Sequence, residues 1–438
     1  MLSAFVSAFR TPDLRKKLVF TLAIIGIFRL GASVPTPGTS TKNINKCIEI
    51  VNNGANKDVY SLLNLFSGGA LLHLSVFALG IMPYITSSII IQLLIVVIPR
   101  FEALKKEGQS GQNKLTQYTR YLTIGLAILQ STGYIALARN GNLFQGCDPA
   151  TYPILIKDDV FHLTVMVITM MAGTALIMWF GELITDRGIG NGMSILIFTG
   201  IAARIPSEGM AILRGAGGTI FFFVCVLGLA IITAVVYVEQ AQRRVPVQYA
   251  KRMVGRRMYG GTSTYLPLKV NQAGVIPVIF ASSLLYIPSL LTQFSGNGTS
   301  ATKRFVQNYL VKQDSWAYIL IYFALIVFFT YFYVSITFNP EERADDMKKH
   351  GGFIPGIRPG RPTAEYLQYV LSRITLPGSL YLGIVAVLPN FFLSITQGNN
   401  QNFPFGGTAV LIMVGVGLDT VKQIESQLMQ RNYEGFLR

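Results

Sequence analysis

Long apolar runs separated by short charged segments dominate the pattern of hydrophobic and polar positions in this chain. A helix needs about 20 consecutive apolar residues to cross the roughly 30 Å hydrocarbon core of a bilayer. The runs that reach or approach this length are 18–34, 116–138, 160–180, 217–239, 274–294, 317–338, 376–395 and 407–427. The pattern therefore predicts an all-α protein that crosses a membrane many times.

Two further apolar segments do not fit this simple template. Residues 59–99 carry no charge, so this segment is too long for one span and has no charged loop that would divide two spans. Residues 190–205 supply about 14 helical residues before Pro206, or roughly 21 Å of helix. We expect residues 81–98 to cross once and residues 190–205 to cross as a short helix inside the bundle.

The apolar segment that precedes residue 81 would then remain on the outer side of the membrane. Non-helical backbone at membrane depth is tolerated only where it is packed in protein or faces a watery cavity. We therefore expect a short re-entrant segment at about residues 64–75, acting as a movable stopper in a vestibule. An ordinary bent helix is the alternative.

The distribution of Lys and Arg decides the number of crossings. With one crossing in each irregular segment, most of the 37 Lys and Arg residues fall on the side of the N-terminus. Cytoplasmic loops collect Lys and Arg, and a basic N-terminal tail normally stays inside, so only this count is self-consistent. The sequence predicts ten spans with both termini cytoplasmic. No small-residue cleavage site follows the first run, and we expect that span to be retained.

The stretch GIMPYITSS, residues 80–88, has a near-echo in GVIPVIFASS, residues 274–283. In the ten-span count the first copy runs inward and the second runs outward. Antiparallel copies of one motif are typical of an inverted repeat, whose functional site lies near the midplane between the halves. We expect two pseudo-symmetric five-helix halves, residues 1–205 and 206–438. Chance recurrence of short Gly, Pro and Ser patterns is the alternative.

Composition supports the membrane prediction and narrows the function. The chain of 438 residues is 51% hydrophobic and 13% charged, with a mean hydropathy of +0.46 and a net charge of +16. A chain of this composition has more apolar surface than a soluble protein can bury in its core, which is typical of a membrane protein. The Cys and His residues show no metal-type spacing, and the sequence contains no P-loop, metalloprotease pair or nucleophile elbow. We expect no enzyme, no metal and no cofactor; at most Cys47 and Cys147 would pair outside.

Two predicted cytoplasmic loops, 240–272 and 339–375, carry distinctive cations. The first contains seven Lys or Arg residues and no acid, and strand-like segments on both sides predict a ribbon with Arg256 and Arg257 near its tip. The second contains FIPGIRPGRP, which is stiff because each proline fixes its backbone angle, and it presents Arg358. Such loops attract polyanions such as RNA or an acidic protein. Positive-inside bias alone is the alternative for the first loop, and a simple linker is the alternative for the second.

Several stretches, taken in order, resemble the SecY family of protein-translocation channels over essentially the full chain. They are NLFSGGAL, FALGIMPYITSSIIIQLL, KKEGQSGQNKLTQYTRY, MWFGELITDRGIGNGMSI, QRRVPVQYAKR, GRRMY, LPLKVNQAGVIPVIFASS, FNPEERADDMKKHGGFIPGIRPG and FGGTAVLI. The resemblance implies an hourglass-shaped, ten-helix channel that hinges between helices five and six and opens to lipid between helices two and seven. It would pass unfolded secretory polypeptides across the membrane and release signal sequences and transmembrane segments into lipid.

The resemblance also implies roles for particular positions. A ring of aliphatic side chains would close the waist and exclude ions by dewetting: Ile81, Ile85, Ile197, Ile279 and Ile412. The plug would include Asn64, Phe66, Ser67, Gly68, Gly69 and Leu72. The lateral gate would be lined by Pro83, Thr86, Ser87, Gln92, Pro277, Ser282 and Ser283. Contacts with SecA or the ribosome would involve Arg243, Arg244, Arg256, Arg257 and Arg358.

The partners implied by the resemblance are SecE and SecG, the SecA ATPase, the ribosome, signal peptides, nascent or unfolded polypeptides and membrane lipids, with SecDF and YidC as further candidates. The channel would lie in the bacterial plasma (inner) membrane and would need no cofactor, because SecA would hydrolyse the ATP. A secondary transporter with inverted repeats is the main alternative. Coupled transporters place acids at mid-membrane, whereas Glu182, Glu239 and Asp419 fall at predicted cytoplasmic ends.

Overall fold

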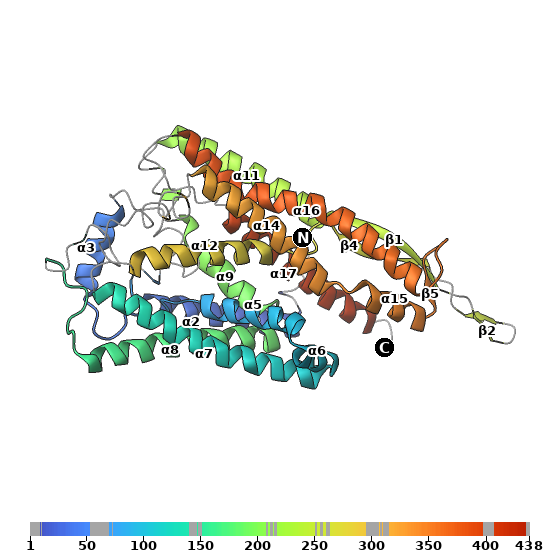
Figure 1. Ribbon diagram of the computed structural model, residues 1–438, viewed down its shortest axis with the longest axis horizontal. Coiled ribbons are helices and arrows are strands. Elements are labelled where there is room, and N and C mark those ends of the chain that lie inside the picture. The colour runs from blue at the N-terminus through green and yellow to red at the C-terminus, as the bar shows by residue number, and fades with distance from the viewer. Residues whose placement is uncertain are drawn as a thin grey trace.

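The computed structural model of this chain is an elongated bundle of helices (Figure 1). It describes residues 9, 11–52, 70–71, 73–139, 147, 151–206, 209–210, 213, 217–249, 252–254, 257–259, 263–294, 306, 309, 315–396 and 407–434. The helices that run along the bundle are α2 (Pro12–Ser33), α5 (Met82–Val97), α7 (Gln109–Arg139), α8 (Val160–Arg187), α9 (Gly192–Ala202), α11 (Gly218–Gln240), α12 (Ile276–Phe294), α14 (Trp316–Thr337), α16 (Arg361–Thr396) and α17 (Gly407–Glu434). Successive helices of this set run in opposite directions, as the predicted crossings require.

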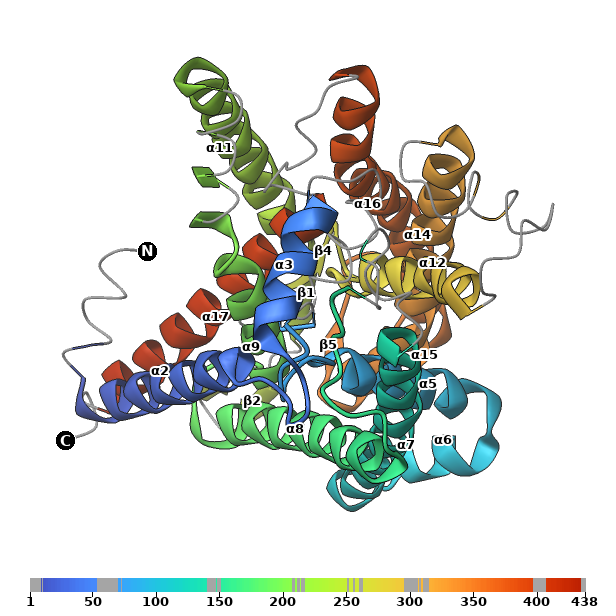
Figure 2. The same ribbon diagram turned by 90° about the vertical axis from the view of Figure 1, so that its left-hand side faces the viewer.

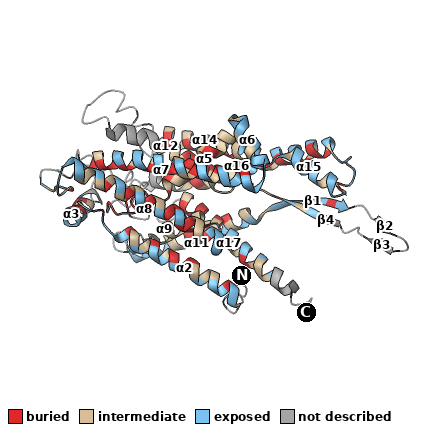
Figure 3. Cartoon of the chain, turned by 90° about the horizontal axis from the view of Figure 1, so that it is seen from below, coloured by how far each residue is buried: buried red, intermediate tan, exposed pale blue. Residues whose placement is uncertain are grey.

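Several of these helices are suited to a membrane by length and composition. Among the described residues, 5 helices are long and apolar enough to cross a membrane. The number rises to 6 if α5 and α6 (Pro99–Lys106), which are bent by 100° relative to each other, count as one span. Large apolar side chains such as Phe223 on α11 and Leu320 on α14 are exposed on the outside of the bundle. Lipid contact explains such exposed apolar surface. Buried residues gather along the middle of the bundle (Figure 3).

The short helix α9 has 11 residues and begins abruptly after Asn191. The Asn191 side chain accepts hydrogen bonds from the backbone N–H groups of Met193, at 3.1 Å, and Ser194, at 3.3 Å. This N-cap satisfies donors that the first turn would otherwise leave unpaired. At 1.5 Å per residue α9 spans about 16 Å, which is less than the hydrocarbon thickness. The predicted short helix is confirmed.

Helix packing divides the bundle into two groups. Within the first half of the chain α5 packs against α7, α7 against α8 and α8 against α9; within the second half α12 packs against α14, α14 against α16 and α16 against α17. The most extensive helix contact between the groups is that of α9 with α17. Figure 2 looks along the bundle and shows α9 and α17 on one side and α5 and α12 on the other.

The two echoing motifs adopt the same local structure. Gly80 and Gly274 have positive φ angles of 56° and 62°, a conformation that glycine adopts readily. Each glycine is followed two residues later by the start of a helix, α5 or α12, and Pro83 and Pro277 each occupy the first turn, where the missing N–H has no helical partner to lose. The two helices then run in opposite directions, as an inverted repeat predicts (Figure 1).

A β ribbon extends from one end of the bundle, here called the ribbon end (Figures 1 and 3). Strand β1 (Gln242–Tyr249) pairs antiparallel with β4 (Ser263–Lys269), and β2 (Arg252–Val254) pairs with β3 (Arg257–Tyr259). Arg257 opens β3 opposite Val254, as the predicted ribbon requires, whereas Arg256 lies outside the described residues. Helix α2 begins and α17 ends on this side of the molecule (Figure 3).

The predicted loop 339–375 is largely helical. It contains α15 (Pro340–Lys349), the two-residue strand β5 (Gly352–Phe353), which pairs with β1, and the start of α16. Helix α16 begins at Arg361 with Pro362 in its first turn, a position that suits proline. Helix α16 therefore starts within the predicted loop and continues without a break into the apolar span.

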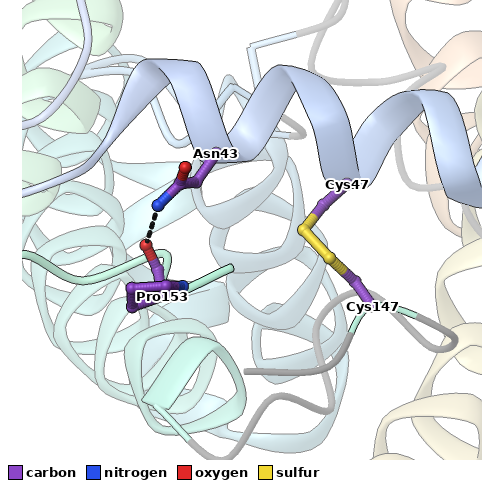
Figure 4. The surroundings of a disulfide bond; sticks show 4 residues. All are labelled: Asn43, Cys47, Cys147 and Pro153. Atoms are coloured by element: carbon purple, nitrogen blue, oxygen red, sulfur yellow. Dashed lines mark hydrogen bonds between the residues drawn. A yellow bond between two sulfur atoms is a disulfide. The ribbon is translucent and has the colours of Figure 1, made fainter. Parts of the chain in front are cut away.

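The opposite end of the bundle carries a cap built around α3 (Thr41–Asn52). A disulfide joins Cys47 on α3 to Cys147, and Asn43 donates a hydrogen bond of 2.8 Å to the carbonyl of Pro153 (Figure 4). The pairing left open by the sequence is thus present. Both cysteines are buried in an apolar cluster that also contains Leu74. The cap therefore ties α3 to the segment that leads into α5.

Candidate channel waist, gate and vestibule

The five side chains predicted to form a pore ring lie in one buried apolar cluster. Ile81, Ile197, Ile279 and Ile412 are 4, 7, 9 and 2% exposed, and Ile85 packs against the same cluster. They come from α5 and its N-cap, α9, α12 and α17, that is, from helices of both groups. Aliphatic side chains offer water no hydrogen bonds, so a constriction of this kind resists wetting.

Aromatic side chains fix the cluster from the first half of the chain. Phe77 stacks on Phe28 of α2 with ring centroids 5.9 Å apart and meets Phe180 of α8 edge-on at 6.5 Å. These separations are typical of favourable aromatic pairs. A Cβ atom at Gly31 would overlap the Phe77 ring, and glycine therefore makes room for it. Phe77 thereby anchors the segment that precedes α5.

The predicted gate residues on α5 bond within their own helix. Ser87 is buried and donates 2.8 Å to the carbonyl of Pro83, and Thr86 donates 3.0 Å to the carbonyl of Met82. Gln92 lies further along α5, where it lines a cavity. The hydroxyl groups of this lip are satisfied locally.

The predicted gate residues on α12 are Pro277, Ser282 and Ser283, and of the two serines Ser282 bonds within its own helix. Pro277 is buried in the first turn, and Ser282 donates 2.9 Å to the carbonyl of Ile279. The buried hydroxyl oxygen of Ser283 has no hydrogen-bond partner among the described residues. In the described part of the chain, no hydrogen bond joins a gate side chain of α5 to one of α12. Separating the two helices would therefore break no hydrogen bond between the described gate side chains of the two lips.

A cavity of about 520 Å³ lies between α5 and α12. Residues of α5, α7, α8, α9 and α12 line it, from Asn113 and Gln92 near the ribbon end to Ile85, Ile197 and Ile279 at the ring. The cavity thus forms a vestibule that ends at the apolar cluster.

An ion pair that the sequence analysis missed lies in the wall of this vestibule. Arg120 of α7 binds Glu182 of α8 through two hydrogen bonds of 2.8 Å, one from Nε and one from Nη2. Bidentate pairs of this type are the strongest charge-assisted contacts. Asp186, one turn after Glu182, also lines the vestibule. The signal available in the sequence was an Arg and two acids at the predicted inner ends of consecutive spans.

The predicted partner arginines that the structure describes gather at the ribbon end. Arg243 and Arg244 are exposed on β1, and the Arg244 guanidinium lies 4.9 Å from the centroid of the Tyr265 ring. Arg358 is exposed on a loop that β5 holds against β1, and its carbonyl accepts a 2.9 Å hydrogen bond from Thr363. Arg257 lies on β3.

The predicted plug lies mostly outside the described residues, which exclude Asn64, Phe66, Ser67, Gly68, Gly69 and Leu72. Its described part consists of turns, and Leu74 and Ser75 are fully buried. The carbonyl of Leu74 accepts a 2.9 Å hydrogen bond from the Thr36 N–H. The C-terminal end of the predicted plug is therefore fixed to the cap.

Taken together, alternating helices, lipid-exposed apolar surfaces, an apolar waist and a vestibule define a multi-pass α-helical membrane channel. The family model described as SecY matches residues 75–421. A protein translocase subunit SecY from Mycobacterium tuberculosis is 67% identical over 444 residues, and one from Streptomyces coelicolor is 64% identical over 442 residues; each alignment covers 100% of both chains. The chain belongs to the SecY family.

Solved structures share the fold. One described as the structure of a protein conducting channel matches with a TM-score of 0.64 at 17% identity, covering 94% of this chain and 91% of that chain. Sec61 in the canine ribosome-channel complex matches with a TM-score of 0.60 at 17% identity, with the same coverage of 94% and 91%. The comparisons give no support to the transporter alternative.

Proposed function

We propose that this chain forms the protein-conducting channel of a bacterial translocase. It passes unfolded secretory polypeptides across the membrane and releases signal sequences and transmembrane segments sideways into lipid. The observation that carries the proposal is the convergence of Ile81, Ile85, Ile197, Ile279 and Ile412 in one cluster at the end of a vestibule. Flexible aliphatic side chains yield to a polypeptide and close behind it, and they exclude ions by dewetting.

The gate opens between α5 and α12. The two halves, residues 1–205 and 206–438, hinge in the connection between α9 and α11, and the α9–α17 contact supports this hinge because it lies on the side away from α5 and α12 (Figure 2). The hydroxyl groups of Thr86, Ser87 and Ser282 are bonded within their own helices, which supports a low barrier to separation. The plug, about residues 64–75, withdraws when the waist is occupied, while its C-terminal end stays bonded through the Leu74 carbonyl to the Thr36 N–H.

Partitioning into lipid selects the clients. A signal sequence has an apolar core of about 7–15 residues, and each leucine-type residue gains about 0.3–0.6 kcal/mol at the bilayer centre. A core of about ten such residues therefore gains roughly 3–6 kcal/mol by leaving the vestibule through the gate. This gain stabilises the open gate while a signal helix is bound.

The ribbon end faces the cytoplasm, with both termini on that side of the bacterial plasma membrane. There Arg243, Arg244, Arg256, Arg257 and Arg358 engage the SecA motor or the ribosome. Structures of the canine ribosome-channel complex and of yeast Ssh1 bound to the 80S ribosome share this fold and support a ribosome contact. SecE and SecG associate with the bundle, and SecDF and YidC are further partners. The chain itself acts without enzymatic chemistry.

Photo-crosslinking tests the proposal. A crosslinking amino acid is placed at Ile85, at Ile279 and, as a control, at Leu320, which is 64% exposed on the outer face of α14. A stalled secretory chain is then added to channels in membranes with their motor or ribosome bound. We expect crosslinks from both waist positions and none from Leu320. Absence of crosslinks at both waist positions would refute the assigned polypeptide path.

A further inference from the structure

The vestibule between α5 and α12 carries charge of opposite sign to the molecule as a whole. The chain has a net charge of +16, and the ribbon, residues 242–269, contains Lys and Arg but no acid. The charged side chains that line the vestibule are Arg120, Glu182 and Asp186. One base and two acids give this cavity a net negative charge within a strongly basic chain.

The arrangement of these groups leaves one carboxylate available. Arg120 is committed to Glu182 through both of its 2.8 Å hydrogen bonds, and the Arg120 and Glu182 side chains are 44% and 22% exposed. Asp186 follows Glu182 by four residues on α8 and therefore lies on the same helix face. It forms no ion pair within the described part of the chain. A cleft with low-dielectric walls concentrates the field of such a charge.

We propose that Glu182 and Asp186 form a docking site for the cationic N-terminal region of a client segment, with Arg120 as the resident cation that a client Lys or Arg displaces. The inference rests on the proposed channel function. A signal sequence combines a positively charged N-terminal region with an apolar core of about 7–15 residues. The vestibule offers a counterpart for each part, because Ile276, Ile89 and Phe280 supply apolar wall to the same cavity that the two carboxylates line.

The chemistry favours a cation over an anion. An anion entering the vestibule would face two carboxylates, and the guanidinium that could bind it is already held bidentately by Glu182. A client cation instead meets the Asp186 carboxylate, which forms no ion pair within the described residues, and a second carboxylate, Glu182, that it shares with Arg120. The site keeps that end at the inner surface while the apolar core leaves through the gate.

The test uses the complete channel with its partners in vesicles and two clients with the same apolar core. One client carries four Lys residues in its N-terminal region and the other carries four Gln residues. Crosslinking from Ile85 measures occupancy in the wild type, Asp186→Asn, Glu182→Gln and Arg120→Gln. Asp345→Asn is the matched control, because Asp345 is an exposed carboxylate on α15 that does not line the vestibule.

We expect Asp186→Asn to lower capture of the Lys client by at least about threefold and to leave the Gln client unchanged. Arg120→Gln removes the competing cation and should raise the preference for the Lys client. Added salt should weaken the Lys preference of the wild type. Equal losses for both clients, or no loss for either in Asp186→Asn, would overturn the docking site. Asp186 is exposed and forms no ion pair within the described part of the chain, so Asp186→Asn leaves no ion-pair partner unpaired there. If neither client crosslinks to the wild type, the channel function fails, and the docking site fails with it.

Discussion

Breaking the Cys47–Cys147 disulfide is expected to destabilise the outer cap. The bond joins cysteines separated by 100 residues. In the chain-entropy account, cross-linking a loop of about 100 residues stabilises a fully unfolding chain by about 4.7 kcal/mol. Helix α7 lies within this loop and stays inserted and helical when packing is lost, because backbone groups in lipid must remain bonded. The effective loop is shorter, and we expect roughly 2–4 kcal/mol.

The perturbation is the double substitution Cys47→Ser and Cys147→Ser, compared with reduction of the wild type. Backbone hydrogen bonds from Ser40 to Ile154, at 2.9 Å, and from Ile156 to Gly38, at 3.0 Å, do not depend on the bond. The cap should therefore loosen without detaching. With about 2 °C per kcal/mol for a large domain, the expected fall in Tm is about 4–8 °C.

Thermal unfolding of the purified protein and limited proteolysis of α3 would measure this change. The matched control is Cys225→Ser, which alters the free cysteine on α11. A reductant should lower the Tm of the wild type and of the control but should not lower that of the double variant further. The reasoning is wrong if the double variant unfolds at the wild-type temperature, or if Cys225→Ser produces the same shift.

Three further predictions concern the waist, the helix packing and the ribbon end. Ile279→Ser should raise ion conductance of idle channels in vesicles several-fold, because a hydroxyl hydrates the constriction; unchanged conductance would count against a dewetted ring. Gly173→Ala should destabilise the protein by about 1–3 kcal/mol, because the added Cβ meets the carbonyl of Val76. Gly125→Ala on α7, where nothing lies within 4 Å, should be neutral or slightly stabilising, and equal thermal shifts for the two would contradict the packing argument. Arg358→Glu should slow association of the cytoplasmic partner about tenfold at low salt, whereas Arg139→Glu at the opposite end should not, and equal binding rates would remove Arg358 from the contact.

The bundle was predictable from the sequence because its determinants are local. The length of an apolar run identifies a helix, as for α11 and α14. The turns at Gly80 and Gly274 depend only on the glycine and the one or two residues next to it, so the repeated motif predicts them. The ribbon followed from strand-like segments around a basic turn. The start of α16 was not predicted because proline suits both a turn and a first helical turn, so the sequence does not distinguish Pro359 in the loop from Pro362 in the helix.

Side-chain partnerships between distant helices were not predictable in the same way. The Arg120–Glu182 pair depends on the rotation of α7 and α8 about their axes, which a run of apolar residues does not encode. The disulfide depends on where α3 comes to rest across the cap. The convergence of the five isoleucines was expected only through family resemblance, since isoleucines at these positions look like ordinary apolar helix residues.

The vestibule is lined at the waist by Ile85, Ile197 and Ile279, and this arrangement has an electrical consequence. Electrolyte that fills the vestibule is nearly an equipotential, and the membrane voltage then falls mainly across the thin apolar partition beyond it. Carrying one elementary charge across the full voltage involves about 2.3 kcal/mol per 100 mV. Most of this electrical work is therefore done on a charged client residue while it crosses the short apolar waist. With a negative interior, each carboxylate is driven outward as it crosses, each ammonium group is held back, and the order of charges along a client sets a sequence of pauses.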